Sequence, residues 1–293
     1  MQNQTVSFLT QSLESTNNQK GHDWLQKQIE KISSEGIPSK FFLAFSQASR
    51  YFKKEKLSLS AEDINKADEL SAGFQPEFWD ELQTVRTLLM LSYPQEKQAW
   101  FDAMNQLFET ADMHEHQALF AALPLMPYHE ELIPRAIDGL RTNISLVFDA
   151  IALNNPFPAK YFPEANWNQM VLKAIFMQRP LYRIQGLEKR RNLDLAGIAR
   201  DFAHERWAAG RDVMPEIWRL VSPFVNDQYL EDLQRTIGTN DELQIKAALL
   251  TLRESAFLPA KETLESYPDQ VAKLDIEAIA WERIGSEFQR TRV

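Results

Sequence analysis

The feature that most constrains the fold is a helical period that continues, with short breaks, along almost the whole chain. Apolar residues recur at steps of three and four, and from Pro76 onward the periodic segments are roughly twelve to twenty residues long. No segment alternates apolar and polar residues strictly, as a half-buried strand would. The pattern therefore predicts an all-α protein. The breaks fall at proline or glycine, namely Pro94, 124–127, 156–163, 180–186, Pro215, Pro223, Gly238, Pro259 and Pro268.

Short connections between successive helices favour antiparallel neighbours. We therefore expect stacked antiparallel helix pairs in an irregular α-solenoid similar to a HEAT-like superhelix. No motif recurs by residue identity, so the solenoid prediction depends on the rhythm of the helices alone. The length of 293 residues fits a single elongated all-helical domain, 1–293, in which residues 1–70 are a candidate N-terminal helical subdomain.

The first seventy residues carry ordinary amphipathic patterns. Residues 5–35 are expected to form one or two helices, and 39–54 a further one. Ser60, with Asp63 three residues later, has the spacing of a helix N-cap. The buried face of the helix at 39–54 is predicted to consist of Phe41, Phe42, Phe45, Ala48 and Phe52.

Composition excludes several classes of protein. Hydrophobic residues make up 44% and charged residues 25% of the chain, as in a soluble globular protein. Cysteine is absent, so disulfides, thiolate metal sites and a cysteine nucleophile are ruled out. The start has no signal-peptide pattern and no apolar run is long enough to span a bilayer, so we expect a cytoplasmic protein without direct membrane insertion.

The charge is acidic overall but uneven. A formal charge of −9 argues against nucleic acid as a partner, because such partners reward clustered Lys and Arg. Residues 179–211, however, contain eight basic and four acidic residues, a local charge of +4. We expect a small anionic ligand to be attracted to this stretch.

Polar side chains gather in the central part of the chain, beginning at Arg141. The predicted helix at 142–154 has an apolar stripe (Ile144, Val147, Phe148 and Ile151), which Asn155 would continue. Because Pro156 ends the helix, Asn155 is expected to be a C-terminal cap in a left-handed conformation, although a ligand contact stays open. Asn143 and Asn154 point in similar directions away from the stripe. They are either solvated or line a polar groove.

The segment at 164–177 is apolar nearly all round, so we predict a buried helix. It contains Trp167, and its polar residues Gln169 and Lys173 are one turn apart. A lysine there must reach water, a carboxylate or a ligand, because an unpaired buried charge is costly.

The predicted helix at 188–210 has two distinct faces. Arg206 continues an apolar stripe formed by Leu195, Ala199 and Phe202, so we expect it to be largely buried and paired with a carboxylate. The opposite side is cationic and aromatic, which suits a planar or anionic group. A structural network in which both faces pack is the alternative. We call this opposite side the cationic aromatic face; it consists of Arg200, His204, Trp207 and Arg211.

No motif commits the chain to a chemistry. His114 and His116 diverge on a helix, so only Asp112 and His116 could share a metal ion, and two ligands are too few for zinc. Asp201 and His204 have the spacing of a di-metal carboxylate site, but the paired repeats that such a site requires are missing. Nucleophile elbows, phosphate loops and the His-Glu-x-x-His motif are absent from the sequence, so we predict no metal and no cofactor.

Several unusual strings resemble the EboA family of bacterial metabolite-traffic proteins. They are RTN at 141–143, NNPFPAKYF at 154–162, WNQMVLKA at 167–174, HERWAAGR at 204–211 and PEIWR at 215–219, with LPLMP at 123–127 and the helix around Trp79 and Arg86. The resemblance covers about 75–255. It implies an all-helical, cytoplasmic, apparently non-enzymatic protein. The genes of such proteins are clustered with those of a prenyltransferase-like membrane protein and of TIM-barrel or dehydroquinate-synthase-like enzymes, and the clusters are associated with moving a secondary-metabolite precursor toward the periplasm.

These observations give a leading hypothesis and two rivals. The first is a non-enzymatic helical adapter or binding protein in the export of a secondary-metabolite precursor. Its groove would be centred on 141–219 and would hold a small anionic or aromatic metabolite or a partner protein of the gene cluster. The second is an enzyme of the same pathway that uses His204, Glu205 and Lys173 for acid-base chemistry. The third assigns the polar residues to a structural network. The candidate ligand-binding residues are Arg141, Asn143, Asn154, Asn155, Trp167, Gln169, Lys173, Arg200, His204, Glu205, Arg206, Trp207, Arg211, Trp218 and Arg219.

Overall fold

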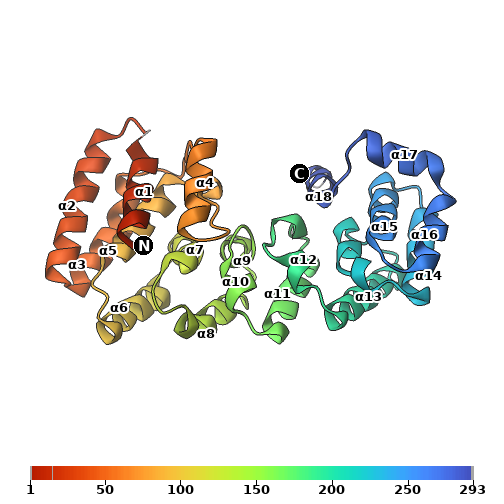
Figure 1. Ribbon diagram of the computed structural model, residues 1–293. Coiled ribbons are helices and arrows are strands. Elements are labelled where there is room, and N and C mark those ends of the chain that lie inside the picture. Colours follow the sequence, from red (N-terminus) through yellow and green to blue (C-terminus); the bar gives the residue numbers. More distant parts are fainter. Residues whose placement is uncertain (1, 15, 292–293) are drawn as a thin grey trace. The chain divides into compact units, whose positions relative to one another are not determined.

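The computed structural model describes residues 2–14 and 16–291, and it is helical throughout (Figure 1). Helix accounts for 74% of the chain, and the described residues contain no strand. One isolated antiparallel bridge joins Lys56 and Asp80. The all-α prediction is confirmed. The chain separates into two compact units, Met1–Phe162 (the N-terminal unit) and Pro163–Val293 (the C-terminal unit), and each is described by itself.

The N-terminal unit contains ten α-helices and three short 3-10 helices among its described residues. Its elements are α1 (Gln2–Glu14), α2 (Gln19–Glu35), α3 (Pro38–Gln47), η1 (Ala48–Arg50), α4 (Ala61–Leu70), η2 (Pro76–Phe78), α5 (Glu81–Ser92), α6 (Lys97–Thr110), α7 (Met113–Ala121), η3 (Leu123–Leu125), α8 (His129–Gly139), α9 (Ser145–Ala152) and α10 (Phe157–Tyr161).

The C-terminal unit contains eight α-helices and three 3-10 helices among its described residues, and the longest of the 3-10 helices, η5, has six residues. Its elements are α11 (Glu164–Phe176), η4 (Leu181–Arg183), α12 (Leu187–Arg190), α13 (Leu193–Ala208), η5 (Pro215–Leu220), η6 (Ser222–Phe224), α14 (Asp227–Ile237), α15 (Glu242–Glu254), α16 (Leu258–Glu265), α17 (Pro268–Ile276) and α18 (Trp281–Arg290).

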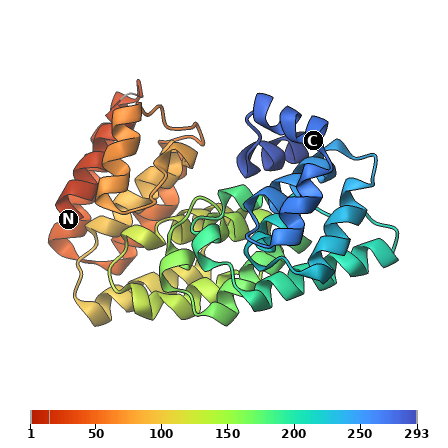
Figure 2. The ribbon, with the colours of Figure 1, turned by 45° about the vertical axis from the view of Figure 1, so that its right-hand side comes forward.

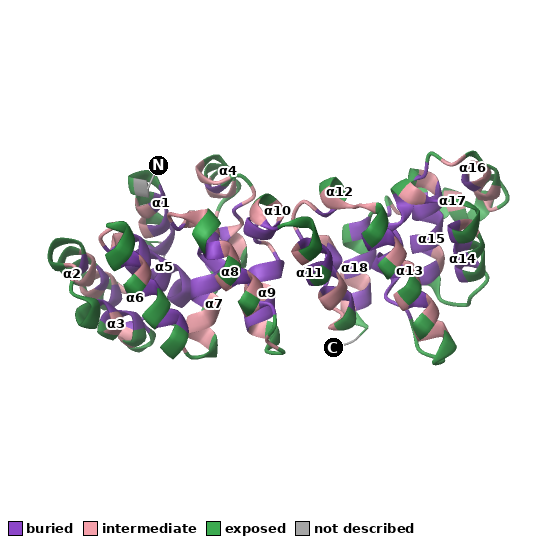
Figure 3. Ribbon diagram, turned by 90° about the horizontal axis from the view of Figure 1, so that it is seen from below, coloured by how far each residue is buried: buried purple, intermediate pink, exposed green. Residues whose placement is uncertain are grey.

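Helix α5 is the centre of the N-terminal unit. It packs against α1, α2, α3 and α7, and every residue from Glu81 to Leu91 is buried (Figure 3). Its buried polar groups are bonded internally: the hydroxyls of Thr84 and Thr87 donate to backbone carbonyls four residues back, and Arg86 donates to Glu115 and to the carbonyl of Phe45. Hydrogen bonds of this kind allow a helix with polar residues to lie in the core.

Helix α15 has the corresponding place in the C-terminal unit. It contacts η5, α14, α16, α17 and α18, and these elements have the blue-green to blue colours of the ribbon in Figure 2. The Thr251 hydroxyl lies 2.8 Å from the Ala247 carbonyl and 3.2 Å from the Trp218 carbonyl, and the Gln244 amide donates to the carbonyl of Val213. These bonds connect α15 to the segment that carries η5.

Several predicted helices are confirmed with corrected limits. Ser60 and Asp63 form the expected reciprocal cap of α4, and α11 corresponds to the helix predicted at 164–177. The helix predicted at 142–154 is shorter, because Thr142 and Ile144 precede α9. Ile144 was expected to be buried and is 45% exposed, since it lies before the first turn.

Two further expectations were wrong. Phe176 was placed in a buried helix, but it ends α11 and is 73% exposed. The helix predicted at 188–210 is interrupted: α12 ends at Arg190 and α13 begins after Asn192, whose side-chain oxygen accepts the Leu195 N–H at 2.9 Å. Asparagine is a strong N-cap residue, so a new helix starts there.

The domain and solenoid predictions stay predictions. Residues 1–70 belong to the N-terminal unit, where α1 and α2 pack on α5, and the boundary between the units falls at Phe162 within the range of the resemblance. Among the described residues, no helix has both the length and the hydrophobicity that a membrane crossing requires.

Candidate functional site

The fifteen candidate residues are divided between the two units. Arg141, Asn143, Asn154 and Asn155 lie in the N-terminal unit, and the other eleven lie in the C-terminal unit. The two groups are therefore described separately, and a single groove over 141–219 stays a prediction.

The cationic aromatic face of α13 packs against α14. Arg200 Nε lies 2.6 Å from Asp232 Oδ2, and His204 Nε2 lies 2.7 Å from Asp232 Oδ1. Asp232 is buried, while Arg200 and His204 are partly exposed. One carboxylate thus binds both basic side chains, which matches the structural-network alternative for these two residues.

The aromatic part of this face is also engaged within the protein. The Trp207 ring lies 5.2 Å from the His204 ring and 5.7 Å from the Trp218 ring, measured between centroids. The guanidinium of Arg235, from α14, is 4.2 Å from the Trp207 centroid, a cation–π contact. Arg211 follows the helix and is exposed. The face therefore holds α13, η5 and α14 together.

The prediction for Arg206 was wrong. Its side chain is half-exposed, and its Nε donates to the backbone carbonyl of Asp212 at 2.8 Å instead of to a carboxylate. Arg206 is close to the C-terminal end of α13, so its long side chain reaches the following loop rather than the core.

The most deeply buried ionisable side chain described in the C-terminal unit is Glu216 of η5. Glu216 is fully buried, and its two carboxylate oxygens accept the N–H groups of Tyr182 at 2.6 Å and Leu181 at 3.2 Å. Burial raises the pKa of Glu216 to about 8, although Arg219 and the two N–H groups act in the opposite direction. Glu216 therefore holds a proton at neutral pH.

Arg219 is buried beside Glu216 and joins three elements. It donates to Glu188 of α12, and its Nη2 lies 3.2 Å from Glu282 of α18. Its Nη1 is buried without a hydrogen-bond acceptor among the described residues. Arg191 donates to the Arg219 carbonyl at 2.9 Å. Arg219 thus ties α12 and α18 to η5, as part of a packed network rather than of an open surface.

The other candidates in the C-terminal unit differ in exposure. Trp167 is fully buried under the guanidinium of Arg190, which lies 4.7 Å from its centroid, while Gln169 and Glu205 are exposed. Lys173 is half-buried, and desolvation lowers its pKa. Trp218 is fully buried, with its indole N–H 3.4 Å from Gln244 Oε1.

In the N-terminal unit, the two asparagines before Pro156 have structural positions. Asn154 adopts the left-handed conformation, with φ of 52°, that was expected for Asn155. Asn155 is buried; its amide donates to the carbonyls of Phe120 and Ala150, and its oxygen accepts the Phe157 N–H. The left-handed conformation was therefore predicted for the wrong residue: Asn154 adopts it, and Asn155 does not. Arg141 and Asn143 are exposed, and Arg141 lies 3.7 Å from Asp138.

A pocket does lie beside this stretch, but other residues form it. Its volume is about 190 Å³, and α6, α7, α8 and α9 surround it. The rings of Phe108 and Phe120 are 5.1 Å apart, and the His116 ring stacks on Phe120 at 5.9 Å. We call it the α9 pocket; it is lined by Phe108, His116, Phe120, Arg135, Asp138, Gly139, Thr142, Ile144 and Val147.

Arg135 is the cationic group of the α9 pocket, and Asp138 supplies a carboxylate to its lining. Its guanidinium lies 5.3 Å from the Phe108 centroid, and its Nη2 is 3.1 Å from the amide oxygen of Asn105. No described carboxylate forms an ion pair with it. The His116 Nε2 is 2.9 Å from the Phe108 carbonyl, which can only accept, so the ring proton is on Nε2. The pocket thus combines an aromatic floor with an unneutralised cation.

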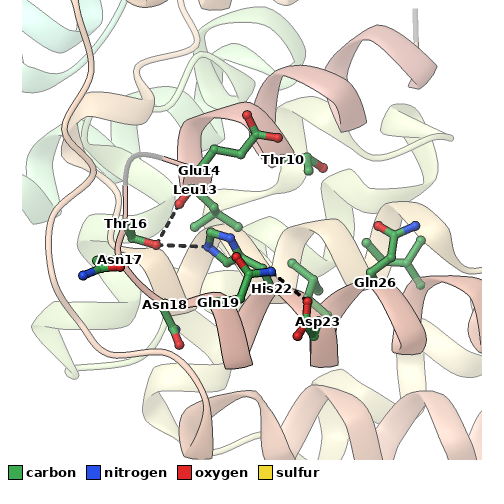
Figure 4. A pocket seen from close by; sticks show the side chains of 12 residues that line it. Thr10, Leu13, Glu14, Thr16, Asn17, Asn18, Gln19, His22, Asp23 and Gln26 are labelled. Carbon is green, nitrogen blue, oxygen red and sulfur yellow. Dashed lines mark hydrogen bonds between the residues drawn. The ribbon is translucent and has the colours of Figure 1, made fainter.

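A larger pocket, of about 560 Å³, lies between α1 and α2 (Figure 4). Several of its polar groups are bonded to other groups of the protein. The Thr16 hydroxyl lies 2.7 Å from the Leu13 carbonyl and 3.1 Å from His22 Nε2, and the Gln19 amide donates to Asp23. The Asn18 side chain caps α2 and donates to the Tyr51 carbonyl. Because these bonds are made within the pocket wall, it offers less to a ligand than the α9 pocket does.

Reasoning from the sequence missed the α9 pocket because its wall comes from several helices. Arg135 and Phe108 each appear ordinary on their own helix. The one residue that could have indicated this pocket is Gly139, at the end of α8. A Cβ at this position would lie 2.4 Å from Phe120, so α8 approaches α7 closely there.

The comparisons with known proteins give a family. No curated protein and no solved structure matches the chain. A family model described as "Metabolite traffic protein EboA" matches residues 5–222, which include the α9 pocket, the cationic aromatic face and the two buried ionisable residues of η5, Glu216 and Arg219. The match covers well over half of the 293 residues. The chain therefore belongs to the EboA family of metabolite traffic proteins.

Proposed function

We propose that this protein is a non-enzymatic helical binding protein that acts in the cytoplasm, in the export of a secondary-metabolite precursor, and holds the transported compound in the α9 pocket. Family membership supports a role in metabolite traffic. The binding role is supported by the environment of Arg135. This arginine is half-buried, lies over an aromatic ring and has no carboxylate partner among the described residues. Small-molecule sites combine apolar walls with a few placed polar groups in this way.

The enzyme alternative has less support. His204 is bonded to Asp232, which also binds Arg200, so its Nε2 is occupied by a structural contact. Glu205 is the next residue on α13, and neighbouring side chains on a helix diverge by about 100°. The geometry thus gives His204 a role in helix packing rather than in proton transfer.

Mass spectrometry of the protein purified from cells that carry the whole gene cluster tests this function. We expect a small molecule to be purified with the native protein in near-stoichiometric amount and to be released unchanged on denaturation. The same molecule should be absent from an Arg135→Ala protein and present in an Arg50→Ala protein, which loses an exposed arginine of η1 outside the pocket lining. A native protein that carries nothing, or that converts the compound on incubation, would contradict the proposal.

We further propose that the loaded protein docks on other proteins of the cluster, the prenyltransferase-like membrane protein or the TIM-barrel enzymes. An affinity pull-down from the same cells, with native and Arg135→Ala protein as bait, would show whether docking depends on the ligand. Retention of none of the cluster's proteins by the native bait would argue against an adapter role.

A further inference from the structure

We propose that the α9 pocket selects a single-ring aromatic carboxylate, with the ring on Phe108 and Phe120 and the carboxylate on Arg135. This inference rests on the proposed function for the assumption that the pocket holds a ligand, and it adds the chemical class. Three observations carry it: the size of the pocket, the geometry of its aromatic floor and the free donors of Arg135.

Size limits the ligand to about one ring. The pocket has a volume of about 190 Å³, and a dry apolar cavity of about 150 Å³ in another protein binds benzene. One ring with a small polar substituent therefore fills the α9 pocket, whereas a fused system of several rings would extend into solvent.

The floor favours an aromatic ring over an aliphatic one. The Phe108 and Phe120 rings are tilted by 53° to each other, and the His116 ring is nearly parallel to Phe120, at 19°. Tilted and offset arrangements of this kind are the ones that aromatic rings prefer, because the positive edge of one ring meets the negative face of another. A further ring in the pocket would meet the part of these rings that the protein leaves exposed, 5% of Phe108 and 3% of Phe120. Ile144 and Val147 supply the apolar remainder of the wall.

Arg135 favours a carboxylate over a neutral group. A guanidinium has five N–H donors in a fixed fork that matches two carboxylate oxygens, and only one contact, to the Asn105 amide, uses them here. The contact with the Phe108 face holds the guanidinium at the edge of the floor, 5.3 Å from the ring centroid. A carboxylate attached directly to a ring on the floor would therefore meet the free donors.

The charge at the rim limits the ligand to one negative charge. Asp138 also lines the pocket, one turn after Arg135 on α8, and it lies 3.7 Å from the exposed Arg141. A dianion such as a phosphate monoester would face one arginine and the Asp138 carboxylate together. A monoanion is paired fully by Arg135, so the electrostatics of the rim favour a carboxylate.

The test compares three probes by NMR titration of the full-length, methyl-labelled protein. The probes are benzoate, benzyl alcohol, which keeps the ring without the charge, and cyclohexanecarboxylate, which keeps the charge without the aromatic ring. We expect benzoate to bind at least about tenfold more tightly than either of the others, since each lacks one of the two interactions. Methyl signals of Ile144 and Val147 should shift, whereas that of Ile37, on the connection between α2 and α3, should not.

Matched variants locate the charge contact. Arg135→Gln should weaken benzoate binding about tenfold and leave benzyl alcohol unchanged, while Arg50→Gln, at an exposed arginine of η1 outside the pocket lining, should change neither. Equal binding of benzoate and benzyl alcohol would overturn the carboxylate assignment, and equal binding of benzoate and cyclohexanecarboxylate would overturn the aromatic one. Shifts confined to other methyl groups, or no shift with any probe, would overturn the inference as a whole.

The binding function and the ligand class can be wrong independently of each other. If benzoate does not bind but a compound is still purified with the native protein and lost from the Arg135→Ala protein, the binding function stands and the proposed ligand class is wrong. If benzoate binds as expected but nothing is purified from cells, the pocket has the inferred selectivity and the traffic role is wrong.

Discussion

The cationic aromatic face of α13 and the α9 pocket have similar residues and different surroundings. Both set arginine and histidine beside aromatic rings. On α13, Asp232 binds Arg200 and His204 within 2.7 Å, whereas no described carboxylate pairs with Arg135 in the α9 pocket. The same composition therefore stabilises a helix contact in one unit and leaves a cation available in the other. What separates structure from recognition is whether the partner charge is supplied by the chain itself.

The largest expected effect is a pH dependence of the unfolding free energy, and it follows from the buried Glu216 in the C-terminal unit. Its pKa is raised to about 8 in the folded protein from 4.5, so between these values the folded state binds a proton that the unfolded state has lost. Stability supplied by this group is complete below pH 4.5 and falls as the pH rises through about 8, by about 1.4 kcal/mol per pH unit and roughly 4 to 5 kcal/mol in all.

Urea unfolding across this pH window checks the prediction. The Glu216→Gln protein cannot titrate at this position, so the difference in unfolding free energy between it and the native protein should change with pH by that amount. A constant difference would mean that Glu216 is ionised in the folded state, stabilised by Arg219 and the N–H groups of Leu181 and Tyr182.

The second expected effect breaks the contact on α13. Asp232→Ala leaves Arg200 and His204 without their shared carboxylate, and loss of one member of a buried pair typically costs about 3 to 5 kcal/mol. Because the two basic partners are partly exposed, we expect about 2 to 3 kcal/mol. The control is Glu231→Ala, the exposed neighbour on α14, which should stay within about 0.5 kcal/mol. Equal denaturant midpoints for the two variants would show that the contact contributes nothing.

Sequence reasoning succeeded where one helix determines the outcome. The 3.6-residue period gave the helical class, and the Ser60 and Asp63 spacing gave the cap of α4. The two faces of α13 were also separated well enough for Arg200, His204 and Trp207 to be grouped, and they do lie together.

The failures at the candidate sites mostly involve a second element, whereas those at Ile144, Phe176 and Asn192 come from misjudged helix ends. Asp232 lies 28 residues after His204 and could not be assigned to that histidine by any helical wheel. Arg135, Phe108 and Phe120 come from α8, α6 and α7, and each is unremarkable in its own helix. Asn155 was singled out correctly, but its bonds reach Phe120 on another helix, so the sequence could not distinguish a cap from a buried anchor.

The third expected effect tests how tightly the C-terminal unit is packed around Glu216, by adding a methyl group at a neighbouring glycine. In Gly285→Ala, the new Cβ would lie 2.4 Å from Tyr182 Cδ1 and 2.6 Å from Glu216 Cδ, and overpacking of this kind costs about 1 to 3 kcal/mol. The matched change is Gly197→Ala on α13, where no atom lies within 4 Å of the added carbon. Because alanine favours helix over glycine, that variant should be more stable by about 0.5 to 1 kcal/mol. Thermal unfolding curves should move in opposite directions; a shift of the same sign in both would contradict this account.

The smallest expected effect on stability is that of replacing Arg135. It directly tests the difference between the α9 pocket and the cationic aromatic face of α13. Arg135→Ala removes one cation–π contact and one exposed hydrogen bond, so the unfolding free energy should fall by no more than about 1 kcal/mol. Arg86 in the same unit is the counterpart: it is 3% exposed and bonded to Glu115 and to the Phe45 carbonyl, so Arg86→Ala should cost about 3 kcal/mol or more. Denaturant titrations of both variants, read by the signals of the N-terminal unit, give the two values side by side. A loss for Arg135→Ala as large as that for Arg86→Ala would mean that Arg135 is a structural residue like Arg200, and the reason for assigning the α9 pocket to a ligand would disappear.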